Sequence, residues 1–265
     1  MRRLEGKVAV ITGGAGGIGS AAAKVFAREG AVVVIADLDV RKGNALAQEI
    51  TAEGGVCHFQ ECDVADGASV RAILGFCEET LGGLDIIYNN AGIYLAGKDG
   101  RLTEIAEEIW EKVLAVNLRS VFLFCKYGIP LLQKRKGGSI INTGSSAGMI
   151  GIPNCDAYTA TKGAIVQLTK SLAAEYGRYN IRTNCISPAA IMTPMVRESN
   201  PPDSDDFDEK AFLHLRTPLR RYGTPEEIAN IALFLASDEA SYLNGAIIAA
   251  DGGITINGDL SKVKV

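Results

Sequence analysis

Short apolar runs rich in β-branched residues recur along the whole chain, and longer stretches of helical periodicity separate them. The runs predict strands at residues 8–12, 32–36, 56–63, 84–90, 139–143, 182–186 and 246–251. Several runs are apolar at consecutive positions, which is typical of parallel strands covered by helices on both faces. The pattern therefore predicts one α/β domain over residues 1–265, built as a doubly wound parallel sheet.

Amphipathic stretches between these strands predict helices at residues 20–29, 68–81, 105–132, 158–179 and 226–236. Thr224 and Pro225 open the last helix as its N-cap and first helical residue. Residues 194–222 break the alternation, because a polar segment runs directly into an apolar one after a strand. A long insertion in a compact domain is usually functional or disordered. We therefore expect residues 194–222 to form a substrate-binding lid.

A glycine-rich loop ends the first predicted strand and leads directly into a helix. Five of the seven residues from Gly13 to Gly19 are glycine, whereas a plain tight turn requires only one or two. Such a loop lets the backbone approach a pyrophosphate, whose charge then lies at the helix N-terminus. We expect a Rossmann fold that binds a dinucleotide through this loop, at Gly13, Gly17, Ile18 and Gly19.

The second predicted strand run leads to Asp37, an acidic residue suited to the adenosine end of a dinucleotide. A carboxylate at this place accepts hydrogen bonds from ribose hydroxyls and repels a 2'-phosphate. Gly14, Ala15 and Leu38 supply no positive charge that would hold such a phosphate. The pattern favours NAD over NADP as the cofactor, although Asp37 could also simply begin a turn.

Tyr158 and Lys162 place a phenol and an ammonium group four residues apart, on one face of a predicted helix. A tyrosine has a pKa of about 10, and a neighbouring positive charge lowers that pKa. The pair can therefore serve as an acid/base unit, or it can lie exposed on a solvated helix. Ser145 and Ser146 follow the strand at 139–143, where ligands of α/β sheets bind, and either could donate to a substrate oxygen or form a turn.

Together, these motifs resemble the short-chain dehydrogenase/reductase family over almost the whole chain. T-G-x-x-x-G-x-G appears at 12–19, Y-x-x-x-K appears at 158–162, and two further family motifs appear as Asp63-Val64 and as Asn89-Asn90-Ala91-Gly92. The resemblance implies that Ser145, rather than Ser146, orients the substrate oxygen. It also implies that Tyr158 exchanges the proton, that Lys162 binds the nicotinamide ribose and tunes Tyr158, and that Asn117 holds a proton-relay water.

The same resemblance implies further cofactor contacts, from Asp63, Val64, Asn90, Ala91, Gly92, Pro188, Ile191 and Thr193. Family members usually have Pro-Gly where this chain has Pro188-Ala189. Because alanine tolerates a positive φ less well than glycine, we expect this loop to take a slightly different path. The resemblance also implies a homotetramer, packed through the helices at 105–132 and 158–179.

Composition narrows the function further. The chain has 27 Lys and Arg residues against 31 Asp and Glu residues, and this net charge of −4 leaves no basic face for nucleic acid. Charged residues, glycine and proline interrupt every apolar run, so we expect no membrane span. The six cysteines form no CxxC pair, and the spacing of Cys57, His58 and Cys62 matches no common zinc site. We expect buried thiols in the cytoplasm and no metal.

The sequence therefore predicts an NAD-dependent oxidoreductase that transfers a hydride between nicotinamide and a secondary alcohol or ketone of small to medium size. Residues 93–95 and 147–155 would line a mainly apolar substrate pocket. One alternative is a biosynthetic ketoreductase, such as one that acts on 3-oxoacyl groups, although many of these use NADPH and Asp37 favours NAD. The other alternative is a nucleotide-binding regulator without turnover, against which the intact Ser145, Tyr158 and Lys162 argue.

Overall fold

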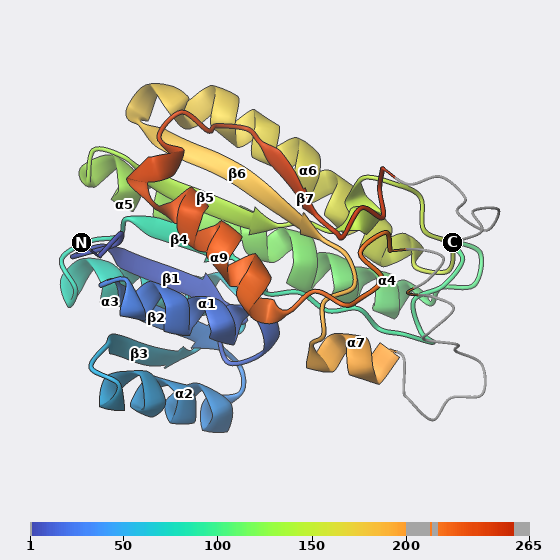
Figure 1. Cartoon of the computed structure of the whole chain (residues 1–265), viewed down its shortest axis with the longest axis horizontal. Coiled ribbons are helices and arrows are strands. Elements are labelled where there is room, and N and C mark those ends of the chain that lie inside the picture. Colours follow the sequence, from blue (N-terminus) through green and yellow to red (C-terminus); the bar gives the residue numbers. More distant parts are fainter. Residues whose placement is uncertain (1, 200–212, 214–216, 257–265) are drawn as a thin grey trace.

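Seven parallel strands form one sheet in the computed structural model, which describes residues 2–199, 213 and 217–256. The strand order is β3-β2-β1-β4-β5-β6-β7, and all the strands end at the same edge of the sheet (Figure 1). This order confirms the predicted doubly wound sheet, with its switch point between β1 and β4. The strands are β1 Val8–Thr12, β2 Val32–Asp37, β3 Val56–Glu61, β4 Ile86–Asn89, β5 Gly138–Thr143, β6 Ile181–Pro188 and β7 Ile247–Ala250.

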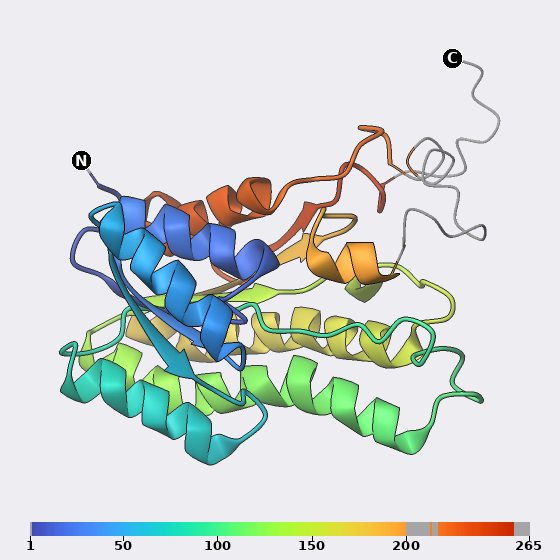
Figure 2. The same cartoon turned by 90° about the horizontal axis from the view of Figure 1, so that it is seen from below.

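Helices cover both faces of the sheet in two layers (Figure 2). One layer contains α1 Gly17–Arg28, α2 Val40–Ala52 and α9 Pro225–Ala236. The other layer contains α3 Gly67–Glu79, α4 Glu107–Leu114, α5 Ser120–Lys134 and α6 Asp156–Tyr176. Strand β1 shows why the apolar runs are continuous, since Ala9 and Ile11 pack in the core under the first layer and Val8 and Val10 in the core under the second.

Two helical features differ from the sequence prediction. The periodicity did not predict α2, which buries only a narrow stripe that contains Leu46 and Ile50 and leaves most of its surface polar. The helix expected at 105–132 is interrupted by a π-helical turn, Ala115–Arg119, which separates α4 from α5. A π-turn shifts the hydrogen-bond register without ending the helix, so a pattern of apolar positions does not reveal it.

The continuous helical stretch Glu107–Lys134 is long and apolar enough to cross a membrane by length and composition alone. Half of its apolar window is buried within the domain. Its α5 part packs on α3 and on strands β4 and β5. A core helix of this kind passes the same test, so the finding is weak evidence for a membrane span.

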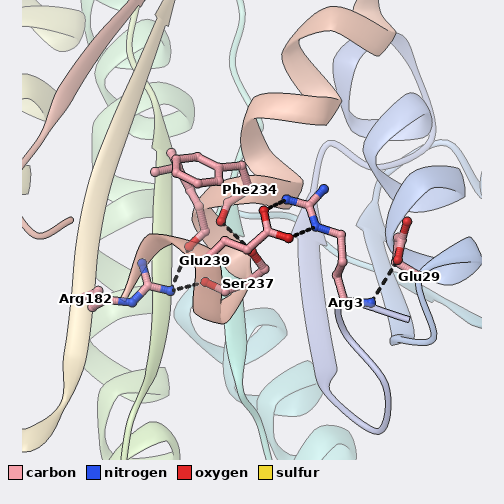
Figure 3. A network of polar contacts seen from close by, with 7 residues as sticks. Arg3, Glu29, Arg182, Phe234, Ser237 and Glu239 are labelled. Atoms are coloured by element: carbon pink, nitrogen blue, oxygen red, sulfur yellow. Dashed lines mark hydrogen bonds and ion pairs between the residues drawn. The ribbon is translucent and has the colours of Figure 1, made fainter. Parts of the chain in front are cut away.

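A hydrogen-bonded clamp fixes the amino end of the sheet, opposite the edge where the strands end (Figure 3). The guanidinium of Arg3 donates to both carboxylate oxygens of Glu239, at 2.9 and 2.5 Å, and its backbone N–H donates to Glu29 at 2.8 Å. Arg182, at the start of β6, donates to the carbonyl oxygens of Leu235 and Ser237 at 2.9 and 3.1 Å. These bonds tie the N-terminal segment and β6 to the end of α9.

The cysteines are all free and buried, as predicted. Burial raises the pKa of Cys57 to about 12, so its thiol carries no charge near neutral pH. The ring of His58 lies against Phe76, with 5.5 Å between the ring centroids. Within residues 2–199, 213 and 217–256, no three or more His, Cys, Asp or Glu side chains gather where a metal ion could bind.

The predicted lid, residues 194–222, lies largely outside the described residues, which omit 200–212 and 214–216. Its first part is the short helix α7, Pro194–Ser199, which follows β6 at the carboxyl edge of the sheet.

Candidate active site

A cavity of about 310 Å³ opens at the carboxyl edge of the sheet, next to the switch point between β1 and β4. Ligands of doubly wound sheets bind at this place. The loops after β1, β2, β4, β5 and β6 contribute to its walls, together with α6 and α7. The predicted site residues in its lining are Gly13, Gly17, Ile18, Asp37, Asn90, Ala91, Gly92, Ser145, Tyr158, Lys162, Pro188, Ile191 and Thr193.

The glycine-rich loop forms one wall and presents backbone rather than side chains. Gly13 and Gly17 have φ values of +62° and +52°, which favour glycine. Helix α1 begins at Gly17 without a side-chain cap, so its first N–H groups remain available for an anion. Gly19 lies outside the lining, but a Cβ there would come within 2.2 Å of the Gly13 carbonyl oxygen. Gly19 therefore lets the helix pack against the loop.

Asp37 lies at one end of the cavity, and two backbone amides hold its carboxylate. The N–H groups of Ala15 and Asp39 donate to its two oxygens, each at 3.0 Å. Lys42 also lines the cavity, and its ammonium forms an ion pair with Asp39 at 3.0 Å. The glycine-rich loop and the position after Asp37 carry no basic residue, and Lys42, which the first turn of α2 brings to the site, was not predicted.

Thr12 and the segment after β4 lock the ends of β1 and β4 together. The Thr12 Oγ1 accepts hydrogen bonds from the backbone N–H groups of Asn90 and Ala91, both at 2.9 Å. The Asn90 side chain donates to the Thr12 carbonyl oxygen at 3.0 Å. Gly92 then lies so close to the catalytic candidates that a Cβ would be 3.5 Å from both Asn117 Oδ1 and Lys162 Nζ. These contacts hold the segment at the centre of the cavity wall.

Tyr158, Lys162 and Ser145 meet at the other end of the cavity. Lys162 is buried, and its Nζ donates to the Thr143 carbonyl oxygen at 2.8 Å and lies 5.5 Å from the centre of the Tyr158 ring. The Ser145 side chain lies close enough to Tyr158 to affect the pKa of its phenol, and its Oγ accepts a hydrogen bond from Ala147 N–H at 3.2 Å. The Tyr94 ring lies on the same side, with its centroid 5.5 Å from that of Tyr158. The pair is therefore not an exposed pair on a solvated helix.

Desolvation dominates the titration of this pair. Tyr158 is partly exposed to the cavity, but burial raises the pKa of its phenol to about 12, against a smaller opposing effect of the nearby Ser145 hydroxyl. Burial also lowers the pKa of Lys162 to about 8. Within the protein alone, the positive charge of Lys162 does not bring the phenol pKa below its ordinary value.

Asn117 lies outside the lining, in the π-turn between α4 and α5. Its side-chain amide forms a pair of hydrogen bonds with the backbone of Ile93, accepting from the N–H at 2.7 Å and donating to the carbonyl at 2.9 Å. The side chain thus attaches the segment after β4 to the helix. Its predicted part in a proton relay stays a prediction.

Three other predicted positions differ in their surroundings. Asp63 and Val64 do not line the cavity, since Val64 packs in the core and the Asp63 carboxylate accepts from Ala65 N–H at 2.9 Å. Their predicted cofactor contacts stay predictions. Ala189 lines the cavity and is not among the described residues with positive φ, so alanine causes no strain there. A backbone hydrogen bond holds the loop that contains Ala189: the Gly223 N–H donates to the Ala190 carbonyl oxygen at 2.9 Å.

Comparisons with known proteins agree with this geometry. A family model described as enoyl-(acyl carrier protein) reductase matches residues 13–255. The chain is 36% identical to cyclohexanol dehydrogenase of Acinetobacter sp. (strain SE19), over 96% of each chain. It is 38% identical to the 3-oxoacyl-acyl-carrier-protein reductase FabG of Thermotoga maritima, over 96% of this chain and 100% of that one. It also superimposes on the crystal structure of levodione reductase with a TM-score of 0.91, at 36% identity over 97% and 100% of the two chains.

The packing of Gly19 gives a first prediction. Gly19→Ala should destabilise the domain by about 1–3 kcal/mol, the usual range for overpacking, and should abolish dinucleotide binding because the loop must move away from α1. Gly75→Ala is the matched control, since Gly75 lies in α3 with open space around its Cβ position. Urea unfolding and calorimetric titration with NAD measure both effects. Wild-type stability and binding in Gly19→Ala would contradict the prediction.

Proposed function

This chain belongs to the short-chain dehydrogenase/reductase family, and we propose that it uses NAD to interconvert a small or medium-sized secondary alcohol and its ketone. The interconversion of secondary alcohols and ketones follows from the family and its dehydrogenase relatives. One observation carries the choice of cofactor and chemistry. A single cavity places the Asp37 carboxylate at one end and Ser145, Tyr158 and Lys162 at the other, with an uncapped helix N-terminus between them.

The residues at the catalytic end divide the proton chemistry among them. In the oxidation direction, the Ser145 hydroxyl donates a hydrogen bond to the substrate oxygen and holds the alcohol beside Tyr158. The Tyr158 phenolate oxygen then accepts the hydroxyl proton. Lys162 binds the nicotinamide ribose and keeps a positive charge near the phenolate, and Asn117 holds a water that relays the proton outward. Bound NAD supplies the hydride acceptor and a second positive charge.

The residues at the other end fit NAD better than NADP. Asp37 repels a 2'-phosphate, and the nearby Lys42 is already paired with Asp39. The exposed N–H groups at the start of α1 fit the pyrophosphate, and Ile191 and Thr193 contribute the wall at the nicotinamide end.

Reduction of 3-oxoacyl groups is the second candidate. The Thermotoga reductase and the cyclohexanol dehydrogenase are 38% and 36% identical to this chain, so identity does not separate the two substrate classes. Asp37 supports the first candidate, because a reductase that draws on NADPH needs room for a 2'-phosphate. A turnover screen with NAD, NADP and their reduced forms against secondary alcohols, cyclic alcohols and a 3-oxoacyl thioester distinguishes them. NADPH-dependent reduction of the thioester alone would reject the proposal.

We further propose a homotetramer in the reducing cytoplasm. The six buried free thiols support a reducing compartment, and membership of the short-chain dehydrogenase/reductase family supports the tetramer. Light scattering at micromolar concentration should therefore give about four times the 28.0 kDa mass of the chain. A monomer under these conditions would contradict the tetramer.

The cofactor preference gives the next prediction. NAD should bind at least about tenfold more tightly than NADP, a difference of about 1.4 kcal/mol. Asp37→Ala should narrow this gap, because it removes the repulsion of the 2'-phosphate. Glu61→Ala is the control, since Glu61 ends the neighbouring strand in register with Asp37 but lies outside the cavity lining. Fluorescence titration with NADH and NADPH measures the ratio, and an unchanged ratio in Asp37→Ala rejects this role for the carboxylate.

The residues at the catalytic end of the cavity give another prediction. Tyr158→Phe should remove nearly all turnover and leave NAD affinity within about a few-fold, because it deletes only the proton-exchanging hydroxyl. Tyr176→Phe, the same substitution near the end of α6, should keep full turnover. Lys162→Ala should lower both NAD affinity and rate. Steady-state kinetics and titration separate these effects, and full activity of Tyr158→Phe would refute the mechanism.

The direction of the pH dependence follows from the same pair. Oxidation requires the ionised phenol, so the oxidation rate should rise with pH. Burial raises the pKa of Tyr158 to about 12 with Lys162 present, and the positive charge of bound NAD should bring the kinetic midpoint below 10. This midpoint belongs to the coupled group rather than to one residue. Lys162→Ala should raise it, and an unchanged pH profile in that variant would show that Lys162 does not tune the phenol.

A further inference from the structure

Helix α6, which carries Tyr158 and Lys162, begins without a cap of its own. Its N-cap residue is Cys155, whose side chain makes no capping hydrogen bond. The first N–H groups of a helix have no acceptor within the helix. Tyr158 is the third residue of α6, so its own N–H belongs to this unsatisfied set.

A segment nearly sixty residues earlier satisfies these amides. Asp156 N–H donates to the Gly100 carbonyl oxygen at 3.1 Å. Ala157 N–H donates to Asp99 Oδ1 at 3.1 Å, and Tyr158 N–H donates to Asp99 Oδ2 at 2.8 Å. One carboxylate therefore holds two consecutive amides, and one of them belongs to the catalytic tyrosine.

The Asp99 side chain is committed to this contact. Only 4% of Asp99 is exposed, and no lysine, arginine or histidine forms an ion pair with it in the described part of the chain. A buried carboxylate is costly unless hydrogen bonds satisfy it, and here backbone N–H groups at a helix N-terminus do so. The contact is thus a buried, hydrogen-bonded helix cap and not an incidental contact on the surface.

The segment that carries Asp99 also packs against the tyrosine. The Asp99 N–H donates to the Leu95 carbonyl at 2.8 Å, which closes the turn that follows Tyr94. The Tyr94 ring lies against Tyr158, and Leu102 N–H donates to Asp156 Oδ2 at 2.9 Å. Residues before and after Asp99 in this segment therefore also contact the first turn of α6.

We propose that Asp99 is a positioning residue for the reaction, which sets the Tyr158 phenol against Ser145 by holding the first turn of α6. The proposal rests on the proposed function. Ser145 comes from the loop after β5, so the distance between the two hydroxyls depends on where the first turn of α6 lies. A misplacement of reacting groups by about 1 Å can lower a rate about 100-fold. The hydrogen bonds from the first turn of α6 to Asp99 therefore matter for the reaction as well as for folding.

Hydrogen exchange of the chain without ligands tests whether Asp99 stabilises the first turn of α6. The first-turn amides of α6 should exchange at least about tenfold faster in Asp99→Ala than in the unmutated chain. Asp99→Asn should fall between them, because an amide side chain offers one acceptor oxygen in place of two. Asp66→Ala is the matched control: Asp66 caps α3 by accepting from Ser69 N–H at 2.7 Å, and α3 contributes nothing to the cavity lining. Unchanged exchange in Asp99→Ala overturns the proposal.

Kinetics test the consequence, with cyclohexanol and NAD as the probes, or with the best alcohol of the substrate screen. Asp99→Ala should lower kcat at least about tenfold and leave the Kd of NAD within about twofold, and the deuterium isotope effect with cyclohexanol deuterated at the carbinol carbon should rise. Asp99→Asn should recover part of kcat and serves as the test if Asp99→Ala does not fold. If Asp99 is only a structural cap, the kcat and the isotope effect of Asp99→Ala should equal those of Asp66→Ala. That result overturns the proposal.

The two hypotheses fail in different ways. No turnover by the unmutated chain on any alcohol rejects the proposed function and, with it, the catalytic part of this inference. An active unmutated chain with an equally active Asp99→Ala variant rejects only the role of Asp99.

Discussion

Backbone N–H groups left unpaired at helix N-termini are the constraint on which this site depends. Every crossover helix that follows a strand starts near the carboxyl edge of the sheet, so several such ends gather there. Asp39 and Asp66 cap α2 and α3 from within their own segments. Helix α1 has no side-chain cap and faces the cavity, which suits a pyrophosphate. Helix α6 receives its cap from Asp99, and this long-range contact joins the helix that carries Tyr158 and Lys162 to the segment that follows β4.

The two ends of the cavity hold their ionisable side chains in different ways. At one end, the backbone N–H groups of Ala15 and Asp39 donate to the Asp37 carboxylate. Around Tyr158 and Lys162 burial favours the neutral forms, since it raises the pKa of the phenol and lowers that of the ammonium. A carboxylate held by backbone groups thus lies at one end of the cavity. At the other end lie two side chains whose neutral forms burial favours.

The sequence predicted those parts of the molecule that local patterns encode. The strands were visible because residues such as Ala9 and Val10 are buried on opposite faces, and the site residues because they belong to linked motifs. Helix α2 was not predicted, since its buried stripe is narrow. The contact of Asp99 with α6 could not be predicted either, because no pattern records which loop reaches a distant helix end. The desolvation that dominates Tyr158 likewise depends on packing that becomes visible only in the fold.

The segment from Asn90 to Asp99 connects the cofactor end of the site to the catalytic end. At its start, the N–H groups of Asn90 and Ala91 bind Thr12, which precedes the glycine-rich loop. In its middle, Ile93 pairs with Asn117, whose amide also donates to Thr161 Oγ1 at 3.3 Å, on α6 beside Lys162. At its end, Asp99 holds the first turn of α6. Since each attachment joins a different element, a displacement of this segment would shift the cofactor loop and the catalytic helix together. A substitution here should therefore affect binding and turnover jointly unless it removes, as at Asp99, the attachment to only one of them.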